Sequence, residues 1–203
     1  DGSHDGPQQL CSDDVSIVIA EPRFLVVRIA SPNFQVLAVV VHGKDATFGA
    51  LDVEQTWSCI TDQVASVRRP LERVISFIDG NCRFGKSDGH DDIIGTLLDS
   101  AASHNFVSEA VIAFCVKLGF FVANTFAHIV KDNHDQGTFR GASNFGVRCD
   151  YIAVDNGVIP LAHSMYTATD FQMGNKKADH LPTAMTVIVS SFSAAPSFRR
   201  RKA

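Results

Sequence analysis

The 203-residue sequence lacks a long hydrophobic run. Its longest apolar stretches, at 36–41 and around 187–189, are far shorter than the roughly 18 residues that a membrane-spanning helix needs. The first residues are polar and Gly-rich, and they do not form the basic start and apolar stretch of a secretory signal. The sequence therefore predicts a soluble protein with no membrane partner, whose N-terminal segment looks cut from a longer chain.

Cysteine pairs and an excess of basic charge are also absent. The five cysteines are spread along the chain and never form a C-x-x-C pair, which argues against a zinc knuckle or a disulfide framework. This usage favours a reducing compartment, so we expect an intracellular location, nuclear or cytoplasmic. With 18 Lys and Arg against 22 Asp and Glu, the net charge of -4 is not typical of a nucleic-acid-binding domain. A metal-dependent nuclease tolerates such a charge because its bound cation offsets local negative charge.

The dinucleotide-binding fingerprint G-x-G-x-x-G is missing from the sequence. His128 and His134 lie six residues apart in a polar loop without a cysteine, which disfavours a zinc site there. Hydrophobic residues (45%) and charged residues (20%) are close to globular averages, and the length suits one domain. We expect a polar segment at 1–14, one domain at 15–192 and a basic tail or linker at 193–203.

Apolar spacing predicts an α/β chain in which strands outnumber helices. Runs rich in β-branched and aromatic residues indicate strands, and apolar residues at steps of three and four indicate helices. Turn residues between 24–29 and 35–42 predict an antiparallel pair, and the near-continuous apolarity of 35–42 predicts a strand buried on both faces. Gly119 is expected to end the second helix as a C-terminal cap. We expect strands at 15–20, 24–29, 35–42, 74–78, 120–124, 138–139, 149–154 and 184–190, and helices at 51–67 and 106–118.

Three polar clusters stand at the ends of predicted strands. Strand ends are where α/β folds gather catalytic groups, because a rigid sheet fixes several loop residues toward one point. Within these clusters, Asp150 can fix the tautomer of an imidazole, or it can be a surface carboxylate paired with Arg148. The clusters are Asp79 with Asn81, Asp150 alone, and Asp179 with His180.

The other two clusters also have a chemical and a structural interpretation. Asp79 and Asn81 lie two residues apart, so in an extended chain both side chains point the same way, toward a proton, a water or a phosphate oxygen. Asp-Gly-Asn is also good turn chemistry. Asp179 can supply an oxygen ligand to Mg²⁺ and His180 an imidazole near a phosphate, or the two can form a solvated turn.

The order, spacing and strand context of these clusters resemble the endonuclease/exonuclease/phosphatase superfamily. The nearest match is the apurinic-type endonuclease domain of non-LTR retrotransposons, and the resemblance covers about residues 24–189. Five ordered matches are far more specific than any one of them. The matched segments are Ile78-Asp79-Gly80-Asn81, Ile94-Gly95, Phe121-Val122-Ala123-Asn124-Thr125, Arg148-Cys149-Asp150-Tyr151-Ile152 and Ala178-Asp179-His180-Leu181-Pro182.

The resemblance implies a DNase I-like fold, a four-layer α/β (α+β) sandwich in which two mostly antiparallel β-sheets pack face to face with helices outside. It also implies phosphodiester hydrolysis assisted by Mg²⁺ or Mn²⁺. Asp79 would handle the nucleophilic water or the leaving oxygen, and Asn81 would orient that water or the phosphate. His180 would contact the scissile phosphate, with Asp150 holding its ring. Asp179 would be a metal ligand.

The chain departs from the family pattern at several positions. Ile78 replaces the usual Gly, Ala178 the usual Ser, and Phe139 the usual Trp. His42 stands where many members have a phosphate-contacting Tyr, and it is either the phosphate-binding donor or an ordinary histidine. The family's first strands, which carry an Asn and a metal-binding Glu, have no match, so we expect an N-terminally truncated domain.

The sequence therefore predicts a metal-dependent endonuclease that nicks DNA as a module of a retroelement polyprotein, fused to a downstream reverse transcriptase domain. Two alternatives stay open. One is a phosphatase or phosphodiesterase of the same superfamily that acts on a small or lipid phosphate. The other is a catalytically impaired remnant that keeps the fold as an interaction module. The missing Glu favours the remnant, whereas the joint presence of the other site residues opposes it.

Overall fold

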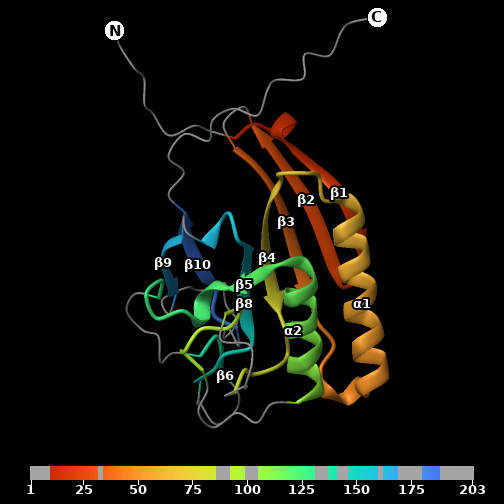
Figure 1. Ribbon diagram of the computed structural model, residues 1–203, viewed down its shortest axis with the longest axis vertical. Helices are drawn as coiled ribbons and strands as arrows, with labels where there is room; N and C mark the ends of the chain where they lie inside the picture. The colour runs from red at the N-terminus through yellow and green to blue at the C-terminus, as the bar shows by residue number, and fades with distance from the viewer. Residues whose placement is uncertain are drawn as a thin grey trace, which may run out of the picture.

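A six-stranded β-sheet forms the centre of the protein, as the computed structural model shows (Figure 1). The structure describes residues 10–31, 34–85, 92–98, 105–130, 137–140, 146–159, 162–168 and 180–187. Neighbouring strands, in the order β1-β2-β3-β4-β8-β5, are antiparallel except for the parallel pair β3–β4. The antiparallel pair predicted from the sequence is β2–β3 and is confirmed. The strands are β1 (Val15–Glu21), β2 (Phe24–Ser31), β3 (Phe34–His42), β4 (Arg73–Asp79), β5 (Phe120–Val122) and β8 (Asp150–Asp155).

Two helices pack on one face of this sheet (Figure 1). α1 (Ala50–Val67) connects the parallel strands β3 and β4. α2 (Phe106–Leu118) packs beside α1 and has the predicted bounds. Within the described ranges, neither these helices nor any other is long and apolar enough to cross a membrane. The described residues also form the short 3-10 helices Ser12–Asp14, Ala46–Phe48 and Ala123–Thr125.

Local hydrogen bonds fix both ends of α2. The side chain of Asn105 accepts hydrogen bonds from the backbone N–H groups of Val107 (3.0 Å) and Ser108 (3.1 Å), which have no partner within the first helical turn. At the other end, Gly119 adopts the left-handed conformation with φ 68°. A glycine takes this conformation without a steric penalty, so the helix ends there as the sequence predicts.

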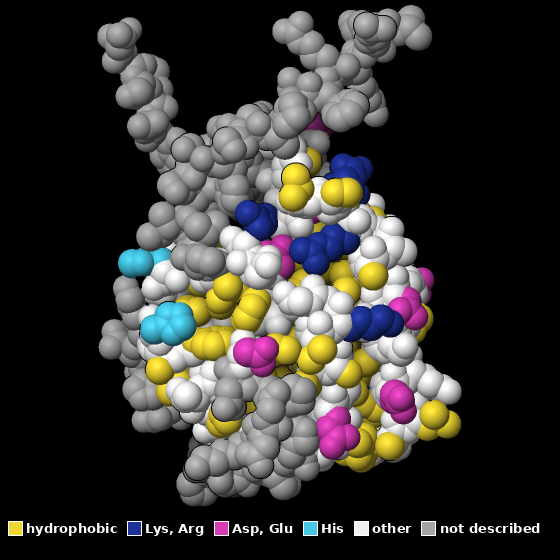
Figure 2. Space-filling model, in the orientation of Figure 1, with side chains coloured by type: hydrophobic (Ala, Val, Ile, Leu, Met, Phe, Trp, Pro, Cys, Tyr) yellow, Lys and Arg dark blue, Asp and Glu magenta, His cyan; other side chains and the backbone are white. Residues whose placement is uncertain are grey.

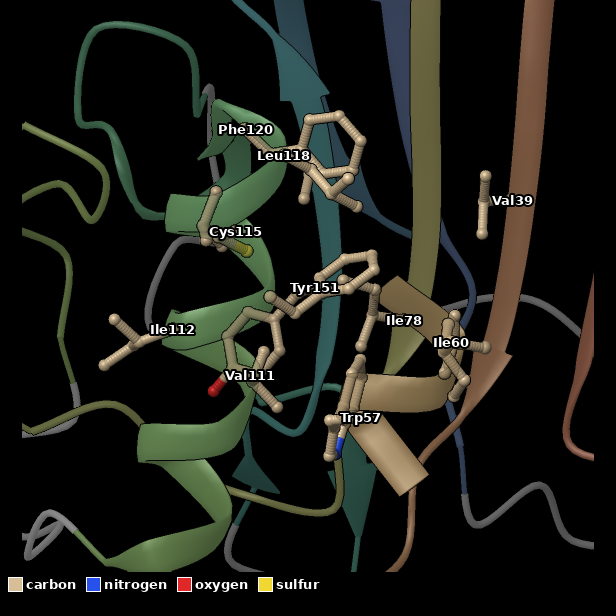
Figure 3. Close-up of a cluster of buried hydrophobic side chains, with 14 of the residues drawn as sticks. Val39, Trp57, Ile60, Ile78, Val111, Ile112, Cys115, Leu118, Phe120 and Tyr151 are labelled. Carbon is tan, nitrogen blue, oxygen red and sulfur yellow. The ribbon is translucent and has the colours of Figure 1, made fainter. Parts of the chain in front are cut away.

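Large apolar side chains fill the space between the two helices and the sheet (Figure 3). The ring centroid of Phe114 on α2 lies 5.2 Å from that of Trp57 on α1 and 5.6 Å from that of Phe120 on β5. Tyr151 of β8 lies in the same cluster, and its hydroxyl donates to the carbonyl of Arg148 (2.9 Å). Burying each such ring contributes about 1.5–3 kcal/mol. The core therefore holds rigid the strand ends where the polar clusters lie.

A second, smaller sheet packs on the opposite face, against β8 and β4. It consists of the antiparallel strands β9 (Ala162–Thr167) and β10 (Thr183–Val187). Met165 of β9 is buried together with Ile152 and Val154 of β8. The described part of the chain is thus a mixed α/β structure with helices, a large sheet and a small sheet in successive layers, which confirms the predicted fold class. A further short pair is β6 (Phe139–Arg140) with β7 (Gly146–Val147).

The β1–β3 part of this second face is open. Val40 of β3 is 44% exposed and its register partner Phe77 of β4 is 41% exposed, while Ile17 of β1 is 69% exposed. The prediction that 35–42 is buried on both faces is therefore wrong for this structure. The reason is that β9 and β10 cover only the β8 side of the sheet.

Other predicted features end early or fall outside the described residues. The strand predicted at 120–124 ends at Val122, because the 3-10 helix Ala123–Thr125 follows it. β7 and β9 were not predicted. The features outside the described residues are the basic tail at 193–203, most of the polar segment at 1–14, His134, Ala178 and Asp179.

A buried carboxylate ties the sheet together at the end where β4 begins. Asp155, 1% exposed, accepts hydrogen bonds from Nη2 of Arg68 (3.1 Å) and from the backbone N–H of Val74 (2.8 Å). It also accepts from the backbone N–H groups of Gly157 (2.9 Å) and Val158 (3.0 Å). Arg68 follows α1 and Val74 lies in β4, so this one side chain links a helix end, a strand and the turn after β8.

Candidate active site

Three polar residues lie side by side where β3, β4 and β8 meet. Asp79, the last residue of β4, is the register partner of His42 on β3 and of Asp150 on β8. Residues directly opposite each other on neighbouring strands project from the same face of a sheet, so the three side chains share one surface. Nε2 of His42 lies 3.8 Å from Oδ2 of Asp79, and the His42 side chain is 64% exposed.

His180 joins this row through Asp150. Its Nδ1 lies 3.1 Å from Oδ2 and 3.2 Å from Oδ1 of Asp150. When Nδ1 carries the proton and donates it to the carboxylate, Nε2 is the ring nitrogen left to face a substrate. The Phe139 ring, which replaces the family's Trp, lies 5.0 Å from the imidazole. The ring of His180 is thus held from two sides while both it and Asp150 stay partly exposed.

The segment Asp79-Gly80-Asn81 is a tight turn. Asn81 has φ 48°, in the left-handed region that Asn tolerates better than most residues. Its backbone N–H donates to Oδ1 of Asp79 (3.2 Å), and its Nδ2 donates to the carbonyl of Gly43 (2.9 Å). Of the two interpretations of this segment, the structure therefore has the turn and not the extended strand. The turn still keeps the backbone N–H of Asn81 within hydrogen-bond distance of Asp79.

Thr138 anchors the segments that carry Asp150 and His180. Its buried hydroxyl accepts hydrogen bonds from the backbone N–H groups of Cys149 and Asp150, each at 3.1 Å. Its carbonyl accepts from the N–H of Leu181 (2.6 Å), the residue after His180. The sequence pattern predicts that Thr138 lies in a short strand and assigns it no part in the site. Its only signal was its place before the aromatic residue of the family pattern.

The remaining motifs of the resemblance meet beside β8. The N–H of Gly95 donates to Oγ1 of Thr125 (2.7 Å), and a Cβ added at Gly95 would lie 2.3 Å from the Thr125 carbonyl oxygen. This close approach requires a glycine. Nη1 of Arg148 donates to the carbonyl of Asn124 (3.1 Å). The I-G, N-T and R-x-D motifs thus form one unit that positions the start of β8.

Negative charge is concentrated at the site. Burial and, next, the neighbouring carboxylate of Asp150 raise the pKa of Asp79 above its ordinary value, although the Asn81 N–H opposes them. Burial and the carboxylates of Asp150 and Asp79 raise the pKa of the Cys149 thiol as well. Both shifts mean that this region disfavours further negative charge. A bound cation would relieve that repulsion.

Candidate metal ligands at the site are of two kinds. Asp79 and Asp150 are carboxylates of the kind that hard cations such as Mg²⁺ prefer. Cys149, Asp150 and His180 offer a sulfur, an oxygen and a nitrogen atom that all lie within 4.8 Å of one another. Asp179, the predicted metal ligand, lies outside the described residues. His128 is exposed and its ring lies 5.8 Å from that of Phe126.

A small cationic rim lies next to His42. The guanidinium of Arg23 and the ammonium of Lys44 each lie 5.1 Å from the ring centroid of Phe48. Arg23 also donates to the carbonyl of His42 (3.5 Å), and Lys44 lies 2.7 Å from Asp52. On the face drawn in Figure 2, Lys and Arg side chains lie mostly in the upper part of the described surface, with one further group at its right edge.

Comparison with solved structures defines the fold. The chain matches an AP endonuclease from Archaeoglobus fulgidus with a TM-score of 0.58 and 16% identity, over 86% of this chain and 70% of that one. It matches the endonuclease domain of TRAS1, a telomere-specific non-LTR retrotransposon, with a TM-score of 0.52 and 17% identity, over 89% and 72%. A mannosyl-6-phosphatase from Bacteroides thetaiotaomicron matches with a TM-score of 0.55 and 14% identity, over 87% and 68%. No protein-family model and no curated protein matches the sequence.

The chain therefore has the DNase I-like fold of the endonuclease/exonuclease/phosphatase superfamily. The resemblance drawn from five short motifs is confirmed at the level of the fold. The structures it resembles include an AP endonuclease, the endonuclease domain of a telomere-specific retrotransposon and a mannosyl-6-phosphatase, and fold alone does not choose among these activities. The activity has to be argued from the site.

Proposed function

We propose that this protein is a divalent-metal-dependent phosphodiester hydrolase that nicks DNA, as the endonuclease module of a retroelement. The observation that carries the proposal is the contact of His180 with both carboxylate oxygens of Asp150, made in the same row as Asp79. An imidazole oriented by one carboxylate, with a second carboxylate beside it, is a set of groups suited to phosphate ester hydrolysis. The structural likeness to the TRAS1 endonuclease domain supports the choice of DNA.

In the proposed mechanism, each residue has one task. Asp79 takes the proton of the attacking water, and its raised pKa makes it a stronger base than an ordinary Asp. As the water oxygen bonds to phosphorus, the bond to the leaving sugar oxygen breaks, and that oxygen keeps the electron pair and takes a proton from solvent. Nε2 of His180 donates to a phosphoryl oxygen and stabilises the developing charge, while Asp150 stabilises the protonated ring. Asn81 orients the water or the phosphate with its amide.

A divalent cation, Mg²⁺ or Mn²⁺, would neutralise charge on the phosphoryl oxygens when bound. The donor chemistry fits such an ion, because the two carboxylates of Asp79 and Asp150 face each other and one raises the pKa of the other. Asp179, the ligand that the resemblance assigns, would hold it beside these two carboxylates. Mg²⁺ is commonly held by only one or two carboxylates, so this small set is enough.

The cationic rim would bind the DNA backbone. Arg23 and Lys44 are the cations found next to His42, and the exposed Phe48 between them offers a flat surface to a base or sugar. A protein of net charge -4 depends on such local cations, since its overall field repels DNA. As a retroelement module, the domain would act on chromosomal DNA and would be joined to a reverse transcriptase domain.

The second candidate function is hydrolysis of a small phosphate. The Bacteroides phosphatase matches this chain about as well as the two nucleases do, with a TM-score of 0.55 against 0.58 and 0.52. The same four groups would serve a phosphomonoester, because they act on the phosphate and not on what it is attached to. The negative net charge also suits a small substrate better than a polymer.

Nicking of supercoiled plasmid in the presence of Mg²⁺ tests the proposal. Wild type, His180→Ala and His128→Ala would be purified in the same way, the last as a control for a histidine away from the row. We expect wild type and His128→Ala to convert the plasmid to relaxed circles, and His180→Ala to be slower by about 10² or more. Hydrolysis of a phosphomonoester without nicking would favour the phosphatase. No turnover of either substrate would favour a remnant that acts only as an interaction module.

A further inference from the structure

A sulfur ligand lies directly beside the proposed catalytic pair. Sγ of Cys149 donates a hydrogen bond to Oδ2 of Asp150 at 3.4 Å, and the same oxygen lies 3.1 Å from Nδ1 of His180. The thiol is buried, whereas the other two groups are partly exposed. The backbone N–H groups of both Cys149 and Asp150 donate to the hydroxyl of Thr138, so the backbone that carries the two side chains is held in place.

These spacings suit a tetrahedral zinc ion. Bond lengths of about 2.3 Å for zinc to sulfur and about 2.0–2.2 Å for zinc to nitrogen or oxygen place neighbouring ligands roughly 3.4–3.6 Å apart. The observed separations around Oδ2 of Asp150 are 3.1 and 3.4 Å, and all three ligand atoms lie within 4.8 Å of one another. Only small side-chain shifts would close the site around an ion.

We infer that Cys149, Asp150 and His180 form a binding site for a borderline-soft divalent cation such as Zn²⁺. Zinc takes Cys, His and carboxylate ligands together, whereas Mg²⁺ takes oxygen ligands and leaves a thiol aside. Binding replaces the thiol proton, which is released to water, by the metal. Three protein ligands leave a fourth position open on the exposed side.

Occupancy of this site removes the proposed catalytic pair. The ion takes Nδ1 of His180 and the carboxylate of Asp150, so the hydrogen bond that orients the imidazole is lost. Zn²⁺ is therefore an inhibitor of the Mg²⁺-dependent reaction, and a chelator reverses it. This consequence rests on the proposed function, whereas the binding of the metal does not.

Cobalt(II) tests the binding without any activity measurement, because a thiolate ligand gives Co²⁺ a charge-transfer absorption band. We expect a saturable band in wild type that Zn²⁺ abolishes. Cys59→Ser, which removes an exposed thiol, should keep the band, and Cys149→Ser should lose it. Should the serine variant misfold, Cys149→Ala serves in its place, with circular dichroism as the check. Absence of the band in wild type, or its persistence without Cys149, overturns the inference.

Inhibition is measured separately by titrating Zn²⁺ into the plasmid-nicking reaction at constant Mg²⁺. Each variant is normalised to its own zinc-free rate. Half-inhibition of Cys149→Ser should need at least about 10-fold more Zn²⁺ than half-inhibition of wild type or Cys59→Ser, since a metal ligand is lost. Equal sensitivity of all three proteins would overturn the inhibitory role. If no protein nicks DNA, the proposed function fails while the cobalt result still decides the metal site.

Discussion

The carboxamide of Asn124 bridges two points on β8. Its Nδ2 donates to the carbonyl of Asp150 (2.9 Å), and its Oδ1 accepts from the N–H of Ile152 (3.2 Å). Asn124 is 4% exposed, so removing it leaves buried polar groups without their partner. We expect Asn124→Ala to lower the free energy of unfolding by about 1–3 kcal/mol, measured by urea denaturation.

Asn124→Ala should also slow catalysis, because a small displacement of Asp150 misplaces the imidazole it orients. A matched control is Asn105→Ala, which removes the N-terminal cap of α2 and costs about 1 kcal/mol. The control should keep its nicking rate at a temperature where both variants are folded. Equal rates for the two variants would show that Asn124 has no positioning role.

Asp150 and His180 should act as a unit. Asp150→Asn keeps the shape of the side chain and removes its charge, and we expect it to lower the nicking rate by about 10² or more. Because Asp150 acts through the ring, adding Asp150→Asn to His180→Ala should cause little further loss. Single-turnover rates of the two single variants and the double variant give this comparison. Losses that simply multiply would mean that the two groups work independently.

Substituting the buried Asp155 should lower the free energy of unfolding far more than substituting an exposed carboxylate. Asp155→Ala leaves Arg68 and several backbone N–H groups without their acceptor, so we expect a loss of about 3–5 kcal/mol in the free energy of unfolding. Asp62→Ala breaks the exposed pair with Lys117 and should cost less than about 1 kcal/mol. Thermal and urea unfolding of both variants provide the measurement. A similar cost for the two would contradict the role assigned to burial.

The cysteines should divide into two reactivity classes. Cys11 and Cys59 are exposed, whereas Cys82, Cys115 and Cys149 are buried. Burial raises the pKa of the Cys115 thiol to about 12, so the reactive thiolate is scarce at pH 8. We expect alkylation of Cys115 in the native protein to be slower than that of Cys59 by roughly 10² or more, and equal in denaturant. Mass spectrometry after timed labelling gives the rates.

The open apolar face should promote association. Ile17 is 69% exposed on the β1–β3 part of the sheet, where Val40 and Phe77 are also exposed. We expect Ile17→Lys to reduce self-association of this 203-residue chain while leaving its unfolding midpoint nearly unchanged. Sedimentation over a range of concentrations is the check, with the exposed helical Leu51→Lys as the control. If Leu51→Lys had the larger effect, association would involve the helical face.

Much of the fold could be predicted from the sequence, because the residues of its helices and central strands follow strong apolar patterns. The bounds of α2 were predicted from a buried face and from Gly119, and the structure shows that Gly119 adopts φ 68°. β9 was missed because Met165 is its only fully buried residue, and its neighbours show no alternation. The end of β5 was misplaced because Thr125 bonds back to the Val122 carbonyl (2.6 Å) and starts a 3-10 turn.

The residues of the site could be predicted only where short motifs occur in the same order along the chain as in the family pattern. Asp79, Asp150 and His180 are brought together as the family pattern suggested. The pattern pointed to Thr138 only through its place before Phe139, and it did not indicate that Thr138 contacts segments distant in sequence. The role of Cys149 as a candidate metal ligand could not be predicted from the sequence either, because it depends on Asp150 and His180 lying next to each other in space. The catalytic roles of all these residues stay predictions.

Trp57 is the chain's single tryptophan, and its position makes the protein its own optical probe. The indole is 2% exposed and lies 5.2 Å from Phe114, so its emission reports the formation of the helical core. The indole also lies next to the site. A Cβ built on Gly43 would lie 2.9 Å from the indole ring, and the carbonyl of Gly43 accepts a hydrogen bond from the side-chain amide of Asn81. Any ligand that moves this turn will change the emission, so binding can be followed without a label and without waiting for turnover.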